Sequence, residues 1–209
     1  MIDAAHAIRT VLETADPVAD GRRARSVLTR SQIIKAMVEL VAEGNPDPGA
    51  VEVAERSAIS LRTVFRHFEE KDEILHAIDD LLVAAYQPLL VAPYRSDIWR
   101  ERLFELIERR CAINEAAAIF RISAVMQRYR SPFVAAKYRR LYAAEKRMLD
   151  AILPEALQTG TQAGLAILMA CSFDNWRLLR QDEELPADQT VAAIKQLVRD
   201  IVKHADVPG

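Results

Sequence analysis

Residues 57–68 read SAISLRTVFRHF, a short basic and aromatic stretch that ends where the chain turns acidic. Ala58 and Ile59 interrupt the helical pattern. Ser60 is a residue type that caps helix N-termini with its hydroxyl oxygen. The stretch therefore predicts a tight turn followed by a short helix over about 61–67.

A second short helix is predicted before this turn, over about 48–56. Asp47 is expected to cap it and Pro48 to open it, since proline is tolerated at the first helical position. Val53 and Ala54 should face inward, and the small side chain of Ala54 allows the two helices to cross closely.

Two short helices joined by a tight turn form the helix-turn-helix arrangement, whose second helix enters the major groove of DNA. Val64 and Phe68 would face the core, with Ile59 filling the angle between the helices. The other residues of the second helix are then free to contact DNA.

The free residues of the second helix have the chemistry for that contact. Arg62 and Arg66 are four residues apart and share one helix face. Either can make a bidentate contact with guanine or bind phosphate. Thr63 and His67 flank that face and are predicted to contact phosphate or polar base atoms, while Leu61 can touch a thymine methyl group.

Further basic residues lie on both sides of the two helices. Lys71 opens the next helix and can bind phosphate together with free backbone N–H groups. Arg22, Arg23 and Arg25 are expected to lie along the DNA backbone or in the minor groove. From residue 22 to residue 68 there are eight Lys or Arg against five Asp or Glu, although the whole chain carries a net charge of −2. The acids at 69–73 oppose this, because they would repel phosphate if they faced it.

The span 29–82 resembles the DNA-binding region of the tetracycline-repressor (TetR) family of transcriptional regulators. The resemblance implies a three-helix helix-turn-helix domain (21–72) and an all-α ligand-binding and dimerisation domain (73–209). Residues 1–20, which hold a weak amphipathic pattern, are expected to be an N-terminal extension, either a short extra helix or an arm. The residues that carry the resemblance are Val53-Ala54, Ile59-Ser60, Thr63-Val64-Phe65, His67-Phe68, Lys71 and Ile74-Leu75.

Three positions depart from the family pattern. Ala58 stands where the family usually has Gly, and a left-handed Ala costs roughly 1 kcal/mol. Residues 49–50 are Gly-Ala where a Thr often contacts phosphate. Phe65 replaces the usual Tyr, so it would contact DNA without a phenolic hydroxyl, and Arg62 and Arg66 would carry more of the affinity.

The rest of the chain also reads as helical, so the fold class predicted is all-α, with nine or ten helices and no strands. Gly is scarce, at 6 residues, which favours helices. The first of these helices is expected to begin at Arg30, with Thr29 and Gln32 as its capping box, and to end at Gly44. The next is expected from Lys71 to Pro88. Further helices are expected over 97–114, 115–129, Ser131-Pro132 to about 152, 161–181, and from Pro186 onward.

The resemblance further implies a pocket in the C-terminal body that binds a small, mostly apolar effector. Aromatic side chains would line it, and polar groups beside apolar helix segments would orient the ligand. The same residues can equally be core residues that satisfy one another. The candidates are Trp99, Arg121, Met126, Tyr138, Tyr142, Asn175 and Trp176.

The resemblance also implies a homodimer, formed through the apolar helix near 161–181 and the final helix as a four-helix bundle. Two recognition helices would then read a palindromic operator in double-stranded DNA. Effector binding would favour a conformation whose DNA-binding domains no longer fit that operator, which is the behaviour of a repressor.

Other functions find little support in the sequence. No Ser-His-Asp, Cys-His, paired-acid or Gly-rich phosphate motif stands out, so we expect neither an enzyme nor a cofactor. Cys111 and Cys171 lack metal-site or disulfide spacing. Residues 1–20 lack the features of a secretory signal, and the run 163–171 is far short of the roughly 20 residues of a membrane span. A cytoplasmic protein without a membrane partner is expected.

Two alternatives remain open. One is a helical ligand-binding protein or enzyme in which the helix-turn-helix is only scaffold. The other is a constitutive repressor that has no effector.

Overall fold

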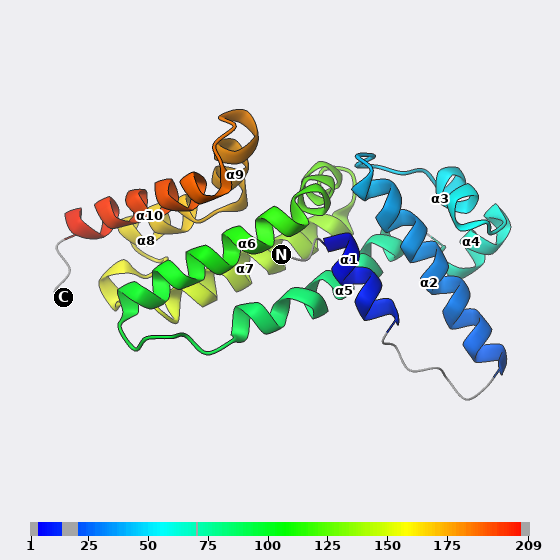
Figure 1. Cartoon of the computed structure of the whole chain (residues 1–209), viewed down its shortest axis with the longest axis horizontal. Helices are drawn as coiled ribbons and strands as arrows, with labels where there is room; N and C mark the ends of the chain where they lie inside the picture. Colours follow the sequence, from blue (N-terminus) through cyan, green and yellow to red (C-terminus); the bar gives the residue numbers. More distant parts are fainter. Residues whose placement is uncertain (1–3, 14–20, 70, 206–209) are drawn as a thin grey trace. The chain divides into compact units, whose positions relative to one another are not determined.

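The computed structural model describes residues 4–13, 21–69 and 71–205. The described residues form ten α-helices and no strand, so the all-α prediction is confirmed. The elements, shown in Figure 1, are α1 (Ala4–Glu13), α2 (Gly21–Ala42), α3 (Ala50–Ser57), α4 (Leu61–His67), α5 (Lys71–Val91), α6 (Trp99–Gln127), α7 (Pro132–Asp150), a 3-10 turn (Glu155–Leu157), α8 (Gln162–Ala170), α9 (Phe173–Arg177), a π turn (Leu178–Asp182) and α10 (Ala187–His204).

The chain folds as two compact units. Unit 1 comprises Met1–Pro88 and Ile119–Tyr138, and unit 2 comprises Leu89–Ala118 and Arg139–Gly209. Helices α6 and α7 therefore both belong partly to unit 1 and partly to unit 2. The predicted functional domains, 21–72 and 73–209, are defined by function and remain predictions.

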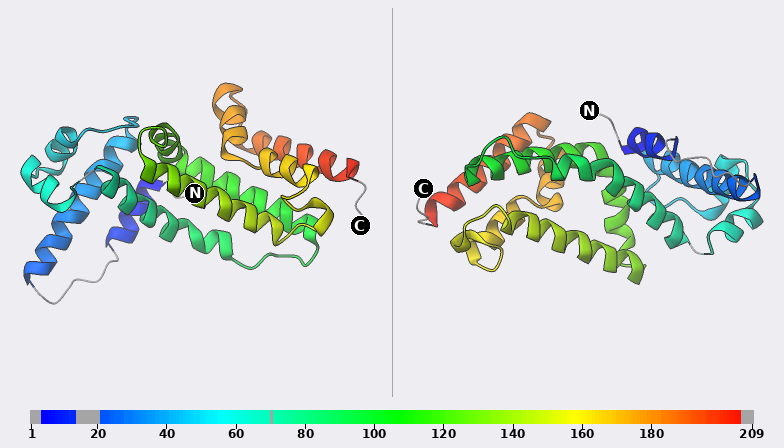
Figure 2. Two further views of the ribbon diagram at one scale, coloured as in Figure 1. Left: turned by 180° about the vertical axis from the view of Figure 1, so that it is seen from behind. Right: turned by 90° about the horizontal axis from the view of Figure 1, so that it is seen from below.

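The core of unit 1 is built on α2. Ile33 and Met37 of α2, Val53 of α3, and Val64 and Phe68 around α4 are each at most 1% exposed. Figure 1 shows α3 and α4 beside α2, and Figure 2 shows α1 packed along the same helix. The inward positions predicted for the two short helices are confirmed for Val53, Val64 and Phe68, and Ala54 is also buried.

The start of α2 differs from the sequence prediction. The helix begins at Gly21, so Thr29 lies inside it and is not an N-cap. The Thr29 hydroxyl donates to the Arg25 carbonyl at 2.9 Å, a bond to the preceding turn. Residues 22–30 hold no Gly or Pro, so nothing in them stops a helix from extending. The predicted end holds, because Gly44 adopts φ +100°.

The start of α3 also differs. Its N-cap is Gly49 and not Asp47, and the Gly49 N–H donates to Glu52 Oε2 at 2.7 Å. Asp47 lies 3.2 Å from Arg130 in an ion pair. The Glu52 carboxylate thus supplies the half of a capping box that accepts the N-cap N–H, while Gly49 has no side chain to supply the other half.

At two positions where the sequence predicts the end of a helix, the helix continues without a break. Helix α5 runs through Pro88 to Val91, and the predicted helices 97–114 and 115–129 are one continuous helix, α6. Pro88 lacks an N–H and so costs α5 one backbone hydrogen bond, and the helix ends three residues later. The Ala-rich junction of α6 has high helix propensity and contains no Gly or Pro that would end the helix.

The predicted long helix over 161–181 is wrong. The segment divides into α8, α9 and a π turn. Ser172 causes the break, because its hydroxyl accepts the Asn175 N–H at 3.1 Å and so starts a new helix. The predicted cap at Ser131 is confirmed in the same way, with the Val134 N–H donating to its hydroxyl at 3.1 Å.

Helix α8 packs against α10 in unit 2, as Figures 1 and 2 show. The side chains with at most 2% exposure in this unit come from every one of its longer helices. They include Leu106, Leu149, Leu157, Ile167, Leu168, Ile194 and Val198.

Within α5, the stretch 72–91 is long and apolar enough to cross a membrane by length and composition, with a mean hydropathy of 1.4. Asp79 and Asp80 lie in the middle of that stretch. Lys137 lies 2.5 Å from Asp79 in an ion pair. Carboxylates at the centre of a bilayer are costly, so we do not propose a span.

Candidate nucleic-acid interface

The turn between α3 and α4 has the predicted conformation. Ala58 is left-handed, with φ 54° and ψ 34°, and ends α3. The Ile59 N–H donates to the Ala54 carbonyl at 3.1 Å, which closes the turn. Ile59 is half-buried between the two helices. This turn fixes the direction in which α4 leaves α3.

Replacing Ala58 by Gly is expected to stabilise the protein by about 0.5–1 kcal/mol, because Gly adopts positive φ without steric cost. Urea unfolding measures the effect. Ala84→Gly, at an exposed position inside α5, is the matched control and should cost about 1 kcal/mol. Equal destabilisation by both substitutions would show that Ala58 is not strained.

Ser60 caps α4 as predicted. The Thr63 N–H donates to the Ser60 hydroxyl at 3.3 Å, and the two hydroxyls lie 2.9 Å apart. The Thr63 hydroxyl is therefore already engaged in the cap, and its side chain is half-buried. This local bonding holds the first turn of α4 in place.

The outward face of α4 carries the two arginines. Arg62 and Arg66 are both exposed, and Leu61 is 38% exposed. No ion pair or hydrogen bond within the described residues holds either guanidinium group. Since Val64 packs beneath them at 1% exposure, the helix is fixed while both arginines remain available to an outside partner.

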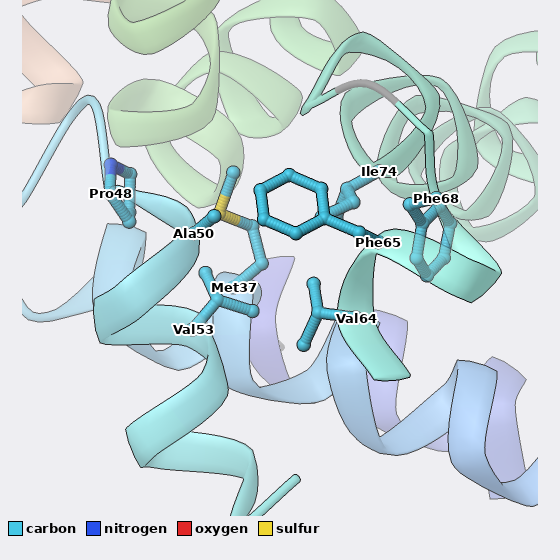
Figure 3. Close-up of a pocket in the computed structure, with 8 residues that line it drawn as sticks. All are labelled: Met37, Pro48, Ala50, Val53, Val64, Phe65, Phe68 and Ile74. Carbon is cyan, nitrogen blue, oxygen red and sulfur yellow. The ribbon is translucent and has the colours of Figure 1, made fainter. Parts of the chain in front are cut away.

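Phe65 lies differently from the arginines. It is 49% exposed, and Figure 3 shows its ring among the side chains of a small apolar hollow. The side chain therefore both lines this hollow and remains partly accessible to solvent. The lining residues are Met37, Pro48, Ala50, Val53, Val64, Phe65, Phe68 and Ile74.

His67 is half-buried at the end of α4. Burial lowers the pKa of its imidazole, and the positive charges of Arg66 and Arg30 lower it further. Both effects favour the neutral imidazole, which can offer a hydrogen bond but no charge.

Sequence reasoning missed the role of Arg30. Its guanidinium donates to the His67 carbonyl at 3.1 Å and lies 4.1 Å from the centroid of the Phe68 ring. Arg30 thus ties α2 to the C-terminal end of α4. Its partners are 37 and 38 residues away, so no local pattern shows the contact.

The remaining predicted DNA contacts lie on α2 and α5. Arg25 is exposed, and its guanidinium donates to the Gly21 carbonyl at 3.1 Å. Arg22 and Arg23 are in the first turn of α2, and Lys71 is the first residue of α5. The side chains of these three residues lie outside the described part of the chain.

The chain is similar in fold to a protein of known crystal structure. That protein is a transcriptional regulator from Rhodococcus sp. Rha1, with a TM-score of 0.64 and 18% sequence identity. The match covers 88% of this chain and 99% of that one. This chain is similar in fold to that regulator. No protein-family profile matches the sequence, and no curated protein sequence matches it.

The predicted effector residues are distributed over both units. Arg121, Met126 and Tyr138 belong to unit 1, while Trp99, Tyr142, Asn175 and Trp176 belong to unit 2. The exposed fractions of Met126 and Tyr142 are 50% and 46%, whereas that of Trp176 is 2%. The Asn175 amide donates to the Ala170 carbonyl at 2.8 Å, and the Arg128 guanidinium stacks on the Tyr138 ring.

No group of three or more His, Cys, Asp or Glu side chains that could hold a metal ion occurs in the described ranges. His76 and Asp80, which have helical spacing, contact each other, with His76 Nδ1 2.7 Å from Asp80 Oδ2.

Both cysteines are buried in unit 2 and reduced. Burial raises the pKa of the Cys111 thiol to about 12 and that of the Cys171 thiol to about 11, from an ordinary value of 9.0. Below pH 9 both thiols are protonated in the folded and unfolded states. Above pH 9 the unfolded chain loses these protons first, so the free energy of unfolding falls as pH rises.

We expect this loss to reach about 1.4 kcal/mol per pH unit for each thiol. Urea unfolding between pH 8.5 and 10.5 measures it. The double variant Cys111→Ala/Cys171→Ala keeps every other titrating group and should show a shallower dependence. If the free energy of unfolding fell equally with pH in the wild-type protein and the double variant, the pH dependence would not come from the two thiols.

Proposed function

We propose that this protein is a sequence-specific DNA-binding transcriptional regulator. The observation that carries the proposal is α4, a capped helix with a buried apolar side and with Arg62 and Arg66 exposed together on its outer side. A helix supported in this way can enter the major groove and present two guanidinium groups to base edges. The likeness in fold to a transcriptional regulator supports the same function.

The regulator is proposed to act as a homodimer on a palindromic operator. The observation behind this is that α8 and α10, which pack together, both expose apolar side chains. Leu165 and Met169 of α8 are 43% and 71% exposed, and Leu197 of α10 is 46% exposed. A second copy packing on these helices would bury such side chains and form a bundle of four helices.

Met169→Glu is expected to weaken self-association at least about tenfold, because it places two unpaired carboxylates in the interface. Sedimentation velocity over a concentration series measures the change. Met126→Glu makes the same substitution at a half-exposed position on α6 and should leave association unchanged. Equal effects of the two variants would move the interface away from α8 and α10.

Repression that is released by a small, mostly apolar effector is the proposed mode of regulation. An effector releases DNA only if it binds the DNA-free conformation more tightly than the DNA-bound one. Coupling of 1–3 kcal/mol is typical, which corresponds to about 5- to 150-fold in operator affinity.

Selection from randomised double-stranded DNA, followed by fluorescence anisotropy across a salt series, tests the central proposal. A regulator should select a palindrome and bind it with log K falling steeply against log salt. Binding that is absent, or indifferent to sequence, would favour a ligand-binding protein or enzyme in which the helix-turn-helix is scaffold.

A further inference from the structure

The last two turns of α6 hold the loop that connects α2 to α3. Both segments belong to unit 1, which includes residues 119–138. The Ser123 hydroxyl donates to the Pro46 carbonyl at 2.5 Å, and the Gln127 amide donates to the same carbonyl at 3.4 Å. The Gln127 amide also donates to the Ser123 hydroxyl at 3.2 Å. The two side chains thus form one small network around a single acceptor in the loop.

The two donors are buried. Ser123 is 4% exposed and Gln127 is 7% exposed. Burial strengthens a hydrogen bond and makes its loss costly. The nearby ion pair between Arg130 and Asp47 is 3.2 Å long, but both of its side chains are exposed, so it contributes little. The two buried donors therefore carry the polar contact between α6 and the loop.

The loop is in turn braced against the start of α3. The Asn45 amide donates to Glu52 Oε1 at 3.0 Å, and the Asp47 N–H donates to Asn45 Oδ1 at 3.1 Å. Pro46 lies inside this braced segment, so a bond that holds its carbonyl also holds the first turn of α3. The left-handed turn and the shared apolar core then carry the orientation of α3 on to α4.

Helix α6 connects this contact to the part of the chain that carries the proposed dimer contact. It is one continuous helix from Trp99 to Gln127, and its first part belongs to unit 2 together with α8 and α10. In a dimer, the half-site spacing of the operator follows from the geometry of the two recognition helices. The orientation of the helix-turn-helix on α6 is one part of that geometry.

We propose that Ser123 and Gln127 are positioning residues that fix the orientation of the helix-turn-helix on α6, and that they thereby restrict the half-site spacing of the operator. They act through the Pro46 carbonyl and α3. The proposal rests on the proposed function as a dimeric DNA-binding regulator. It assigns the choice of half-site spacing to α6, whereas the exposed side chains of α4 read the bases.

The experiment compares the full-length wild-type protein with the double variant Ser123→Ala/Gln127→Met. The variant removes both donors to the Pro46 carbonyl and keeps side chains of similar size. The DNA carries the two selected half-sites at their best spacing, or with one or two base pairs added or removed. One base pair moves a half-site by about 3.4 Å and rotates it by about 35°. Fluorescence anisotropy gives the affinity for each spacing.

The wild-type protein is expected to lose at least about tenfold in affinity when the spacing changes by one base pair, because the DNA must twist or bend to fit. The double variant should bind its best operator about tenfold more weakly, since a loosely held domain has to be ordered on binding. Its affinities at the different spacings should differ by about threefold or less. Its base preference within a single half-site should not change.

Thr190→Val is the matched control. It removes a fully buried hydroxyl that donates to the Leu185 carbonyl at 3.5 Å in unit 2. This control should keep the wild-type spacing preference, which separates a loss of orientation from a loss of stability. The single variants Ser123→Ala and Gln127→Met serve if the double variant does not fold, and each should show a smaller change in the same direction.

Amide hydrogen exchange tests the contact without DNA. The Asp47 and Gly49 N–H groups of the braced loop should exchange about tenfold faster in the double variant than in the wild-type protein, and at the wild-type rate in Thr190→Val. Unchanged exchange would show that α6 does not hold the loop.

Two further outcomes would overturn the proposal. Unchanged spacing preference in the double variant would show that the contact does not orient the helix-turn-helix. An equal loss of affinity at every spacing would show that the contact only supports the fold. A wild-type protein without any sequence preference would instead refute the regulatory function itself, which the other outcomes leave standing.

Discussion

The double variant Arg62→Ala/Arg66→Ala is expected to lose sequence preference and to bind the selected operator no better than random DNA. Both guanidinium groups are exposed on the outer face of α4, and a bidentate contact with a base is worth about 1–3 kcal/mol of discrimination. A dimer would lose each contact twice. Fluorescence anisotropy with operator and scrambled DNA at several salt concentrations measures the loss.

The single variants distinguish the roles of the two arginines. If Arg66 reads a base, Arg66→Ala relaxes specificity at one operator position in each half-site. If it binds phosphate, affinity falls equally for all sequences and the salt slope decreases by about 1 for each contact. Arg147→Ala removes an exposed arginine from α7 in unit 2 and should change neither quantity. If the double variant kept full preference, α4 would not be the recognition helix.

Gly164→Ala is expected to destabilise the protein by about 3 kcal/mol, at the upper end of what overpacking costs. A Cβ atom at this position would lie 1.9 Å from the Gln158 carbonyl oxygen and 2.5 Å from that of Leu157. Both contacts are with backbone, so no side chain can rotate away. Helix α8 would have to move from the turn that it covers, and the side chain of Leu157, which is fully buried, would be exposed.

Gly160→Ala is the matched control for this prediction. A Cβ there meets nothing within 4 Å, so the change should be neutral or slightly stabilising, by up to about 1 kcal/mol. The midpoint of urea unfolding measures both variants. Gly164→Ala should also weaken self-association, because α8 carries Met169 of the proposed interface. A Gly164→Ala protein as stable as the control would mean that α8 does not pack closely on residues 157–158.

The features that could be predicted from sequence are those set by neighbouring residues. The left-handed turn at Ala58, the cap at Ser60 and the inward direction of Val64 follow from side-chain chemistry and helical spacing within one or two turns. The exposed arginine pair on α4 follows from the same spacing. Because these interactions are local, a few neighbouring residues are enough to predict them.

The errors arose where a local signal was present but another residue satisfied the backbone better. Thr29 has the chemistry of an N-cap, yet the helix continues through it because the residues before it also form helix well. Asp47 has the same chemistry, but Glu52 satisfies the backbone N–H of Gly49. Ser172 was overlooked as a cap because the apolar run around it reads as one buried helix.

The sequence by itself determined the all-α fold class and the helix-turn-helix with its exposed arginines, since both depend on spacings of a few residues. Only the tertiary structure decided that Arg30 secures the end of α4, that Ser123 and Gln127 hold the Pro46 carbonyl, and that Gly164 needs to lack a side chain. In the first two cases the partners are tens of residues apart, and in the third the contact is with the backbone of a turn. Burial and close approach between such groups follow from the packing of whole helices, which no short pattern in the chain records.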